Sequence, residues 1–178
     1  TDGALYIADW YDAVVGGHQM KDQKGYGRIY RVSPKKKKLD NPKLNIVTKK
    51  GLLETFQSPA INVRNQAYQS LIKTGNTYLP DFKKLLQSAN PFLKARTIYL
   101  LAALETPESH NMVLTFLDSK VAEERTVAYR ALVSKSTLAK IVKLAEKMAE
   151  DPSPLVRRDV IASISNLDQE KLILKLAQ

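Results

Sequence analysis

The sequence of 178 residues contains no cysteine, only two histidines and no long apolar run. The absence of cysteine excludes disulfides, thiolate metal sites, cysteine nucleophiles and covalent c-type haem attachment within these residues. No apolar stretch approaches the roughly 20 residues of a membrane helix, so we expect no membrane span in these residues. A Gly-x-Ser-x-Gly motif is also missing, and two isolated histidines suggest no catalytic triad.

Positive charge is in excess, with a formal net charge of +10 at neutral pH. Residues 1–50 carry 11 Lys and Arg against 5 Asp and Glu, whereas residues 51–178 carry 17 against 13. The excess is therefore concentrated in the shorter first part, where Lys35 to Lys38 form one run. We interpret this run as a solvated linker rather than as a binding site for an acidic partner.

The later part of the sequence repeats one pattern four times. Each copy has a helix-capping residue, often followed by proline, then an arginine, then apolar residues three, four and seven positions further on. The arginines are separated by 32, 29 and 32 residues: Arg64, Arg96, Arg125 and Arg157. Because each copy starts with a cap and continues with one apolar stripe, each copy predicts the start of a helix.

Further apolar stripes lie between these four helices, over residues 79–86, 112–117 after Thr106 and Pro107, and 138–148, with a last one from Asp168 onward. Two helices every 30 or so residues predict an α-solenoid, because each helix pair has two apolar edges and must stack on its neighbours. The final helix lacks a partner, so we expect the helical array to continue or to dimerise.

The helical part resembles HEAT repeats. The segments Asn62-Val63-Arg64-Asn65-Gln66-Ala67 and Pro154-Leu155-Val156-Arg157-Arg158-Asp159-Val160 match the pattern best, whereas the second and third copies lack valine before arginine. The resemblance implies a mainly α fold, a right-handed α-α superhelix of the HEAT or armadillo type with about four helix pairs and a final helix. It also implies a structural role for the four arginines, in preference to a ladder that binds ligands.

The first fifty residues have a different character. Residues 3–10 and 27–32 are rich in aromatic and β-branched residues and flank a glycine-rich loop, which predicts two strands. Two strands alone are marginally stable in water, so we expect them to belong to a larger sheet. Two prolines and the lysine run then indicate a boundary. The predicted parts are a strand region 1–34, a basic linker 35–50 and a helical region 51–178.

The strand region carries three recognisable segments: Asp2 to Asp12, Gly16-Gly17-His18, and Gly27 to Val32. Together they resemble the last blade of a β-propeller in a bacterial family of membrane-bound dehydrogenases, which is similar to the soluble quinoprotein sugar dehydrogenases. In that family HEAT repeats follow the propeller, and often a c-type cytochrome domain follows them. The resemblance implies an exported, periplasmic parent protein with quinone-dependent or haem-containing sugar dehydrogenase activity, of which this chain is an internal piece.

Few residues suggest chemistry within the chain itself. His18, with Asp9 and Asp12, has the residue types of an acid-base or metal site, but loop carboxylates more often close turns through hydrogen bonds to the backbone. We favour the turn interpretation and expect no cofactor site in this chain. Tyrosines recur beside the helical stripes, and we expect them in the core: Tyr68, Tyr99 and Tyr129.

Two functions fit these features. The first is a non-catalytic scaffold that contacts proteins, namely a neighbouring propeller, a cytochrome domain or another subunit. The alternative is a basic HEAT-repeat protein that binds nucleic acid. Such a protein needs its cations on the second helix of each pair, whereas many lysines here lie on first helices: Lys83, Lys84, Lys140, Lys143, Lys147, Lys171 and Lys175. Charge placement therefore favours the scaffold.

Overall fold

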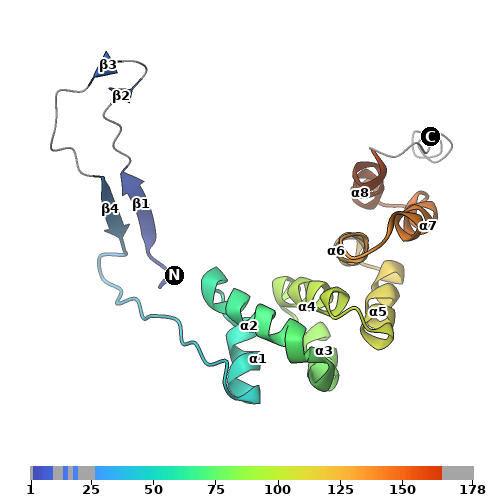
Figure 1. Ribbon diagram of the computed structural model, residues 1–178, viewed down its shortest axis with the longest axis horizontal. Coiled ribbons are helices and arrows are strands. Elements are labelled where there is room, and N and C mark those ends of the chain that lie inside the picture. The colour runs from blue at the N-terminus through green and yellow to red at the C-terminus, as the bar shows by residue number, and fades with distance from the viewer. Residues whose placement is uncertain (1, 10–13, 16–17, 20–26, 166–178) are drawn as a thin grey trace. The chain divides into compact units, whose positions relative to one another are not determined.

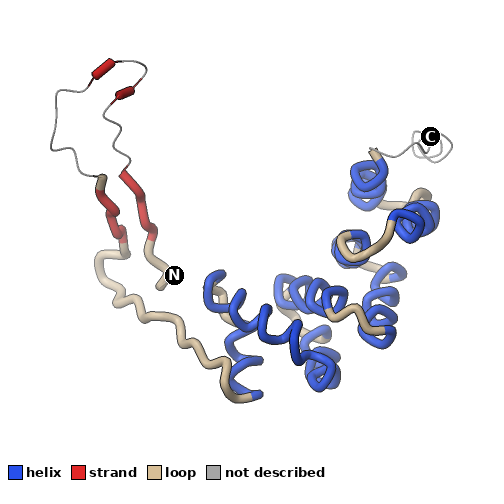
Figure 2. Tube along the Cα trace, viewed as in Figure 1, coloured by secondary structure: helices blue, strands red, loops and turns tan. Residues whose placement is uncertain are grey.

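The computed structural model describes residues 2–9, 14–15, 18–19 and 27–165. Within these residues the chain is mainly helical and carries a small antiparallel hairpin and a second, shorter pair of strands (Figures 1 and 2). Contacts along the chain divide it into two compact units, residues 1–67 and residues 68–178. The first contains the strands and one complete helix, and the second contains the succession of helices.

The hairpin pairs strand β1 (Leu5–Asp9) with strand β4 (Arg28–Val32), in a register that runs from Leu5 opposite Val32 to Asp9 opposite Arg28. The two predicted strands are thus confirmed. The sequence did not predict two shorter strands that lie between β1 and β4 in the chain. These are β2 (Val14–Val15) and β3 (His18–Gln19), which pair with each other. Every residue of β1 and β4 is exposed, so the hairpin has no core of its own.

A segment without helix or strand covers residues 33–48 and leads into helix α1 (Lys49–Gln57). Thr48 caps this helix, because its side-chain oxygen accepts a hydrogen bond from the backbone N–H of Gly51. Gly51 leaves room for the side chain of Asn45, since a Cβ atom at residue 51 would lie 2.2 Å from Cγ of Asn45. The helical region therefore begins two residues inside the predicted linker.

Helices alternate with short turns from residue 61 to residue 164. The elements are α2 (Ile61–Thr74), the 3-10 helix η1 (Gly75–Tyr78), α3 (Leu79–Leu86), α4 (Pro91–Ala103), α5 (Pro107–Leu114), the 3-10 helix η2 (Thr115–Asp118), α6 (Ala122–Val133), α7 (Leu138–Met148) and α8 (Pro154–Ile164). Thr106 and Ser109 form a capping box at the start of α5. The predicted helices at 79–86 and 138–148 are confirmed, and the predicted helix from Asp168 lies outside the described residues.

In the second unit α6 packs between α4 and α8, while α3 packs on α4, and α5 and α7 pack on α6. The helices α4, α6 and α8 therefore succeed one another along one side of this unit, with α5 and α7 along another (Figure 1). Residues from these elements fill the core with exposures of 1% or less: Ile98, Leu100, Leu101, Val113, Tyr129, Leu132, Val156, Val160 and Ile164.

The apolar stripes are confirmed in the main, but the tyrosines behave differently from one another. Tyr129 is buried, as expected. Tyr99 is 36% exposed and Tyr68 is half-buried, so the prediction that all three belong to the core is wrong. Tyr68 donates a hydrogen bond from its hydroxyl to the backbone carbonyl of Tyr99, at 3.4 Å. A phenol placed at the edge of the stripe can bury its ring while its oxygen reaches a partner.

Candidate functional site

The same turn precedes α2, α4, α6 and α8. In each case a side-chain oxygen accepts a hydrogen bond from the backbone N–H two residues later, which is the residue just before the helix. The four acceptor and donor pairs are Ser58 with Ala60, Ser88 with Asn90, Ser119 with Val121 and Asp151 with Ser153, at 3.2, 3.2, 3.1 and 2.8 Å. The recurring unit of the sequence is therefore a recurring turn in the structure.

This turn fixes the position of the repeated basic residue. The backbone N–H of that residue donates the first helical hydrogen bond to the carbonyl of the residue before the helix, in Arg64, Lys94, Arg125 and Arg157. Lys94, and not Arg96, thus holds the equivalent place in α4, and the register predicted for the second copy is wrong by two residues. In the other three copies the arginine lies six residues after the turn residue. Arg96 lies six residues after Asn90, but Asn90 is the N-cap of α4, and the turn residue is Ser88, six residues before Lys94.

Three of the repeated basic side chains fold back onto the turn before their own helix. Arg64 donates to the carbonyl of Pro59 at 2.6 Å, and Arg125 donates to the carbonyl of Ser119 at 2.8 Å. Arg157 donates to the carbonyls of Asp151 and Pro152, at 2.8 and 3.3 Å. A guanidinium carries five donors, so one side chain can satisfy a turn and still contact a neighbouring helix.

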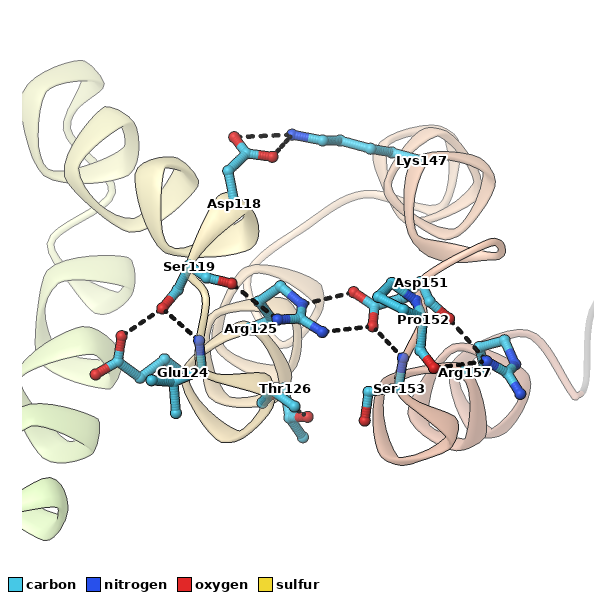
Figure 3. Close-up of polar contacts among 12 residues, drawn as sticks. Asp118, Ser119, Glu124, Arg125, Thr126, Lys147, Asp151, Pro152, Ser153 and Arg157 are labelled. Atoms are coloured by element: carbon cyan, nitrogen blue, oxygen red, sulfur yellow. Dashed lines mark hydrogen bonds and ion pairs between the residues drawn. The ribbon is translucent and has the colours of Figure 1, made fainter.

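Ion pairs join α4 to α6, and α6 to the turn before α8, and Figure 3 shows the second of these links. Lys94 of α4 contacts Glu124 of α6 at 2.5 Å, and Glu124 also accepts a hydrogen bond from the hydroxyl of Ser119 at 2.6 Å. Arg125 of α6 holds Asp151, in the turn before α8, through Nε and Nη2 at 2.7 Å each. We call these residues, together with Arg157, the turn network.

Burial makes the pair of Arg125 and Asp151 the firmest contact of the turn network. Their side chains are only 11% and 5% exposed. The hydrogen bonds from Arg125 hold the pKa of Asp151 below its ordinary value, although burial acts in the opposite direction. Burial raises the pKa of Glu124, but the hydrogen bonds from Lys94 and Ser119 outweigh it, so that pKa is lowered as well. Both carboxylates are therefore ionised at neutral pH.

A second set of contacts joins α6 to α8 along their lengths. Arg130 contacts Asp159 at 2.6 Å, and the hydroxyls of Tyr129 and Ser163 lie 2.6 Å apart. Asp159 is 8% exposed in its side chain, whereas the Arg130 side chain is 48% exposed. Sequence reasoning missed both contacts, because Arg130 and Ser163 lie outside the repeated cap, arginine and apolar positions. The separations of 29 residues for Arg130 and Asp159 and 34 for Tyr129 and Ser163 are close to the repeat length, which is the only signal that points to these pairs.

The structure describes the side chain of only one of the three candidate residues for catalysis, Asp9. Asp9 ends β1, exposed, and its carboxylate lies 3.8 Å from Arg28. His18 lies in β3, where its backbone pairs with that of Val15, and Asp12 lies outside the described residues. Within the described ranges, no three His, Cys, Asp or Glu side chains are arranged to hold a metal ion. Asp9 is thus placed as a partner of Arg28.

A cavity of about 750 Å³ lies within the first unit, lined by Asp2, residues of the segment 40–45 and residues of α1 and the turn after it. The carboxylate of Asp2 is held by Arg31, whose hydrogen bond lowers the pKa of Asp2 to about 2. That carboxylate therefore has no proton to donate near neutral pH and is a poor base. Asp9, the candidate residue whose side chain the structure describes, is not among the residues that line this cavity.

Two further cavities of about 380 and 260 Å³ lie between α5 and α7. They share His110, Ser136 and Lys140, so they form one groove, which we call the α5–α7 groove. Lys143 and Lys147 line its second half together with three leucines. The groove combines an apolar floor with basic residues, and no predicted site residue contributes to it.

Among the described helices, each is too short or too polar to cross a bilayer. The chain was compared with models of known protein families, with curated proteins and with solved structures, and none of the three comparisons gave a match.

Proposed function

We propose that this chain is a non-catalytic scaffold of HEAT-type helix pairs, whose function is to hold and contact other proteins. The observation that carries the proposal is the recurring turn before α2, α4, α6 and α8, together with the ion pairs of the turn network that join α4 to α6 and α6 to the turn before α8. A chain that contacts mainly its sequence neighbours in this way builds an extended stack. The charged side chains of Lys94, Glu124, Arg125 and Asp151 pair with one another between these elements.

The pairing of helices supports the same proposal. The pairs α3 with α4, α5 with α6, and α7 with α8 each occupy one repeat, and α4, α6 and α8 pack in succession. A right-handed superhelix of the HEAT or armadillo type has this order of contacts. In that fold the first helices of the pairs form the convex surface and the second helices the concave surface.

The parent protein that we propose is an exported bacterial dehydrogenase with a β-propeller, of which the hairpin of β1 and β4 is the remainder. The exposed apolar side chains of the hairpin support this, since they require a neighbouring sheet or strand: Leu5, Ile7, Ile29 and Val32. The parent would place the scaffold between its propeller and a cytochrome domain or a second subunit. The coding sequence on either side of this chain tests the proposal, through further propeller strands upstream and Cys-x-x-Cys-His downstream.

Nucleic-acid binding is the alternative that the net charge of +10 suggests. Described lysines at 83, 84, 140, 143 and 147 lie on α3 and α7, the first helices of their pairs. On the second helices, Lys94 is engaged by Glu124 and Arg130 by Asp159. Because these two cations are already paired, they offer little to a phosphate backbone, which is why we favour the scaffold.

The test uses the purified chain in two assays. A labelled DNA duplex at about 0.15 M ionic strength should show no change in fluorescence polarisation, since Lys94 and Arg130 of the second helices are held in ion pairs and release few counterions. A quinone with a panel of sugars should give no dye reduction. Salt-sensitive DNA binding would establish the alternative, and sugar-dependent reduction would refute the non-catalytic role.

A further inference from the structure

The α5–α7 groove has the form of a site for an elongated partner. Its first cavity, of about 380 Å³, is lined by the turn before α5 and by the start of α7, and its second, of about 260 Å³, continues along α7. Both helices pack on α6, which forms the support beneath them. Ala102 of α4 also lines the first cavity.

The floor of the second cavity is apolar. Leu114 of α5 and Leu144 of α7 are half-buried there, and Leu117 of η2 is buried. A buried cavity of about 150 Å³ can hold a benzene molecule, so about 260 Å³ offers room for one large aliphatic or aromatic side chain. Removal of such an apolar surface from water is favourable, so an apolar side chain that covers it stabilises the bound state.

The rim of the groove is basic. Lys140, Lys143 and Lys147 recur at intervals of three and four on one face of α7, and His110 of α5 lines both cavities. Two lysines of the groove have acidic neighbours, namely Lys147 with Asp118 at 3.0 Å and Lys135 with Glu105 at 3.6 Å. Among the described residues, Lys140 and Lys143 have no polar or charged partner.

We propose that the α5–α7 groove binds an acidic peptide segment that carries a large apolar side chain. The apolar side chain occupies the leucine floor, and flanking carboxylates contact Lys140 and Lys143. Charge complementarity selects an anionic partner, and the apolar floor favours a peptide over nucleic acid, because a phosphate backbone offers nothing to a leucine surface. The inference rests on the proposed scaffold function and names the class of partner that one surface would hold.

The experiment measures fluorescence polarisation of a labelled peptide, EEDLLEEFLDEE, with the purified chain at about 0.15 M ionic strength. Three comparison probes keep one property each: EEDSSEESSDEE has the same charge without apolar residues, a DNA duplex is anionic, and vesicles with anionic lipid offer a charged surface. The peptide should bind, and each of the other probes should bind at least about tenfold more weakly.

Two matched variants locate the site. The double charge reversal Lys140→Glu with Lys143→Glu should weaken binding by about tenfold or more. The double reversal Lys73→Glu with Lys84→Glu, at two exposed lysines outside the groove, changes the net charge equally and should alter binding less than about twofold. Since all four side chains are exposed, both variants should keep the wild-type circular dichroism spectrum.

Several results would overturn the proposal. No binding of the apolar acidic peptide, equal binding of the serine peptide, the duplex or the vesicles, or an equal loss in the two variants would each do so. In all these cases except binding of the duplex, an unchanged helical stack would leave the scaffold proposal standing. Refutation of the scaffold instead requires enzymatic turnover, or DNA binding that the Lys140 and Lys143 variant retains.

Discussion

Removal of the Asp151 carboxylate should destabilise the helical unit more than any exposed charge change. Asp151 accepts two hydrogen bonds from Arg125 at 2.7 Å and one from the backbone of Ser153 at 2.8 Å, with 5% of its side chain exposed. Removing one partner of such a buried pair costs about 3–5 kcal/mol, because the other charge stays buried without compensation. The Asp151→Ala variant should therefore lose a large share of a total stability of roughly 5–15 kcal/mol.

The measurement is thermal or urea unfolding followed by circular dichroism. At about 2–4 °C per kcal/mol for a chain of this size, Asp151→Ala should lower the Tm by roughly 6–20 °C. The matched control is Asp118→Ala, which removes the exposed pair with Lys147 and should cost about 1 kcal/mol or less. A double-mutant cycle with Arg125→Met isolates the pair itself.

Equal destabilisation by Asp151→Ala and Asp118→Ala would refute the reasoning, since burial would then make no difference. A coupling energy near zero between Arg125 and Asp151 would also contradict it. The variant Asp151→Asn should be intermediate, because an amide oxygen can still accept from Ser153 and from one guanidinium nitrogen while the charge is lost.

Three further outcomes are expected. Leu132→Ala, at a fully buried position of α6, should cost about 2–5 kcal/mol in urea unfolding, whereas Ile161→Ala, 46% exposed on α8, should cost clearly less; equal losses would contradict the observed helix faces. Thr106→Ala should cost about 1 kcal/mol through loss of the capping box of α5, and Thr106→Ser should recover most of it. The lowered pKa values of Asp151 and Glu124 contribute stability that is fully present above the ordinary carboxylate values of about 4 and is lost as the pH falls through the folded values; acid unfolding of Asp151→Asn should accordingly depend less on pH than that of the wild type.

Local signals in the sequence predicted much of the helical order. Asn90 and Thr106 were recognisable as caps, and both accept hydrogen bonds from the first turns of α4 and α5. The strands at β1 and β4 followed from their aromatic and β-branched residues. Such features depend on residues close together in the chain, which is why pattern alone could locate them.

Contacts between elements were much harder to predict. The pairing of Arg125 with Asp151 spans 26 residues, and it depends on the rotation of α6 relative to the following turn. The misplacement of Arg96 in the repeat had the same origin, since both Asn90 and Ser88 are plausible turn residues and only the hydrogen bonds distinguish them. Tyr99 was expected in the core through the same two-residue error: the position four residues after the basic residue, held by Tyr68 and Tyr129 in their copies, belongs in α4 to Ile98, which is 1% exposed.

The α5–α7 groove shows a second limit of sequence patterns. The lysines of α7 were visible as a charged face, but their interpretation depended on what lies beside them. Leu114 and Leu144 come from different helices, and a shared apolar floor appears only when α5 and α7 both pack on α6. A surface of this kind is a property of helix packing rather than of any one segment.

The stacking of α4, α6 and α8 in equal steps is the central claim, and distances between spin labels test it most directly. The chain has no cysteine, so pairs of cysteines can be introduced without background labelling. The three pairs are taken from the equivalent positions Phe92, Glu123 and Leu155. Packed helices lie about 8–10 Å apart, so the two adjacent pairs should give similar short distances and the outer pair about twice that distance. An outer distance as short as the adjacent ones, or adjacent distances that differ widely, would contradict a regular stack.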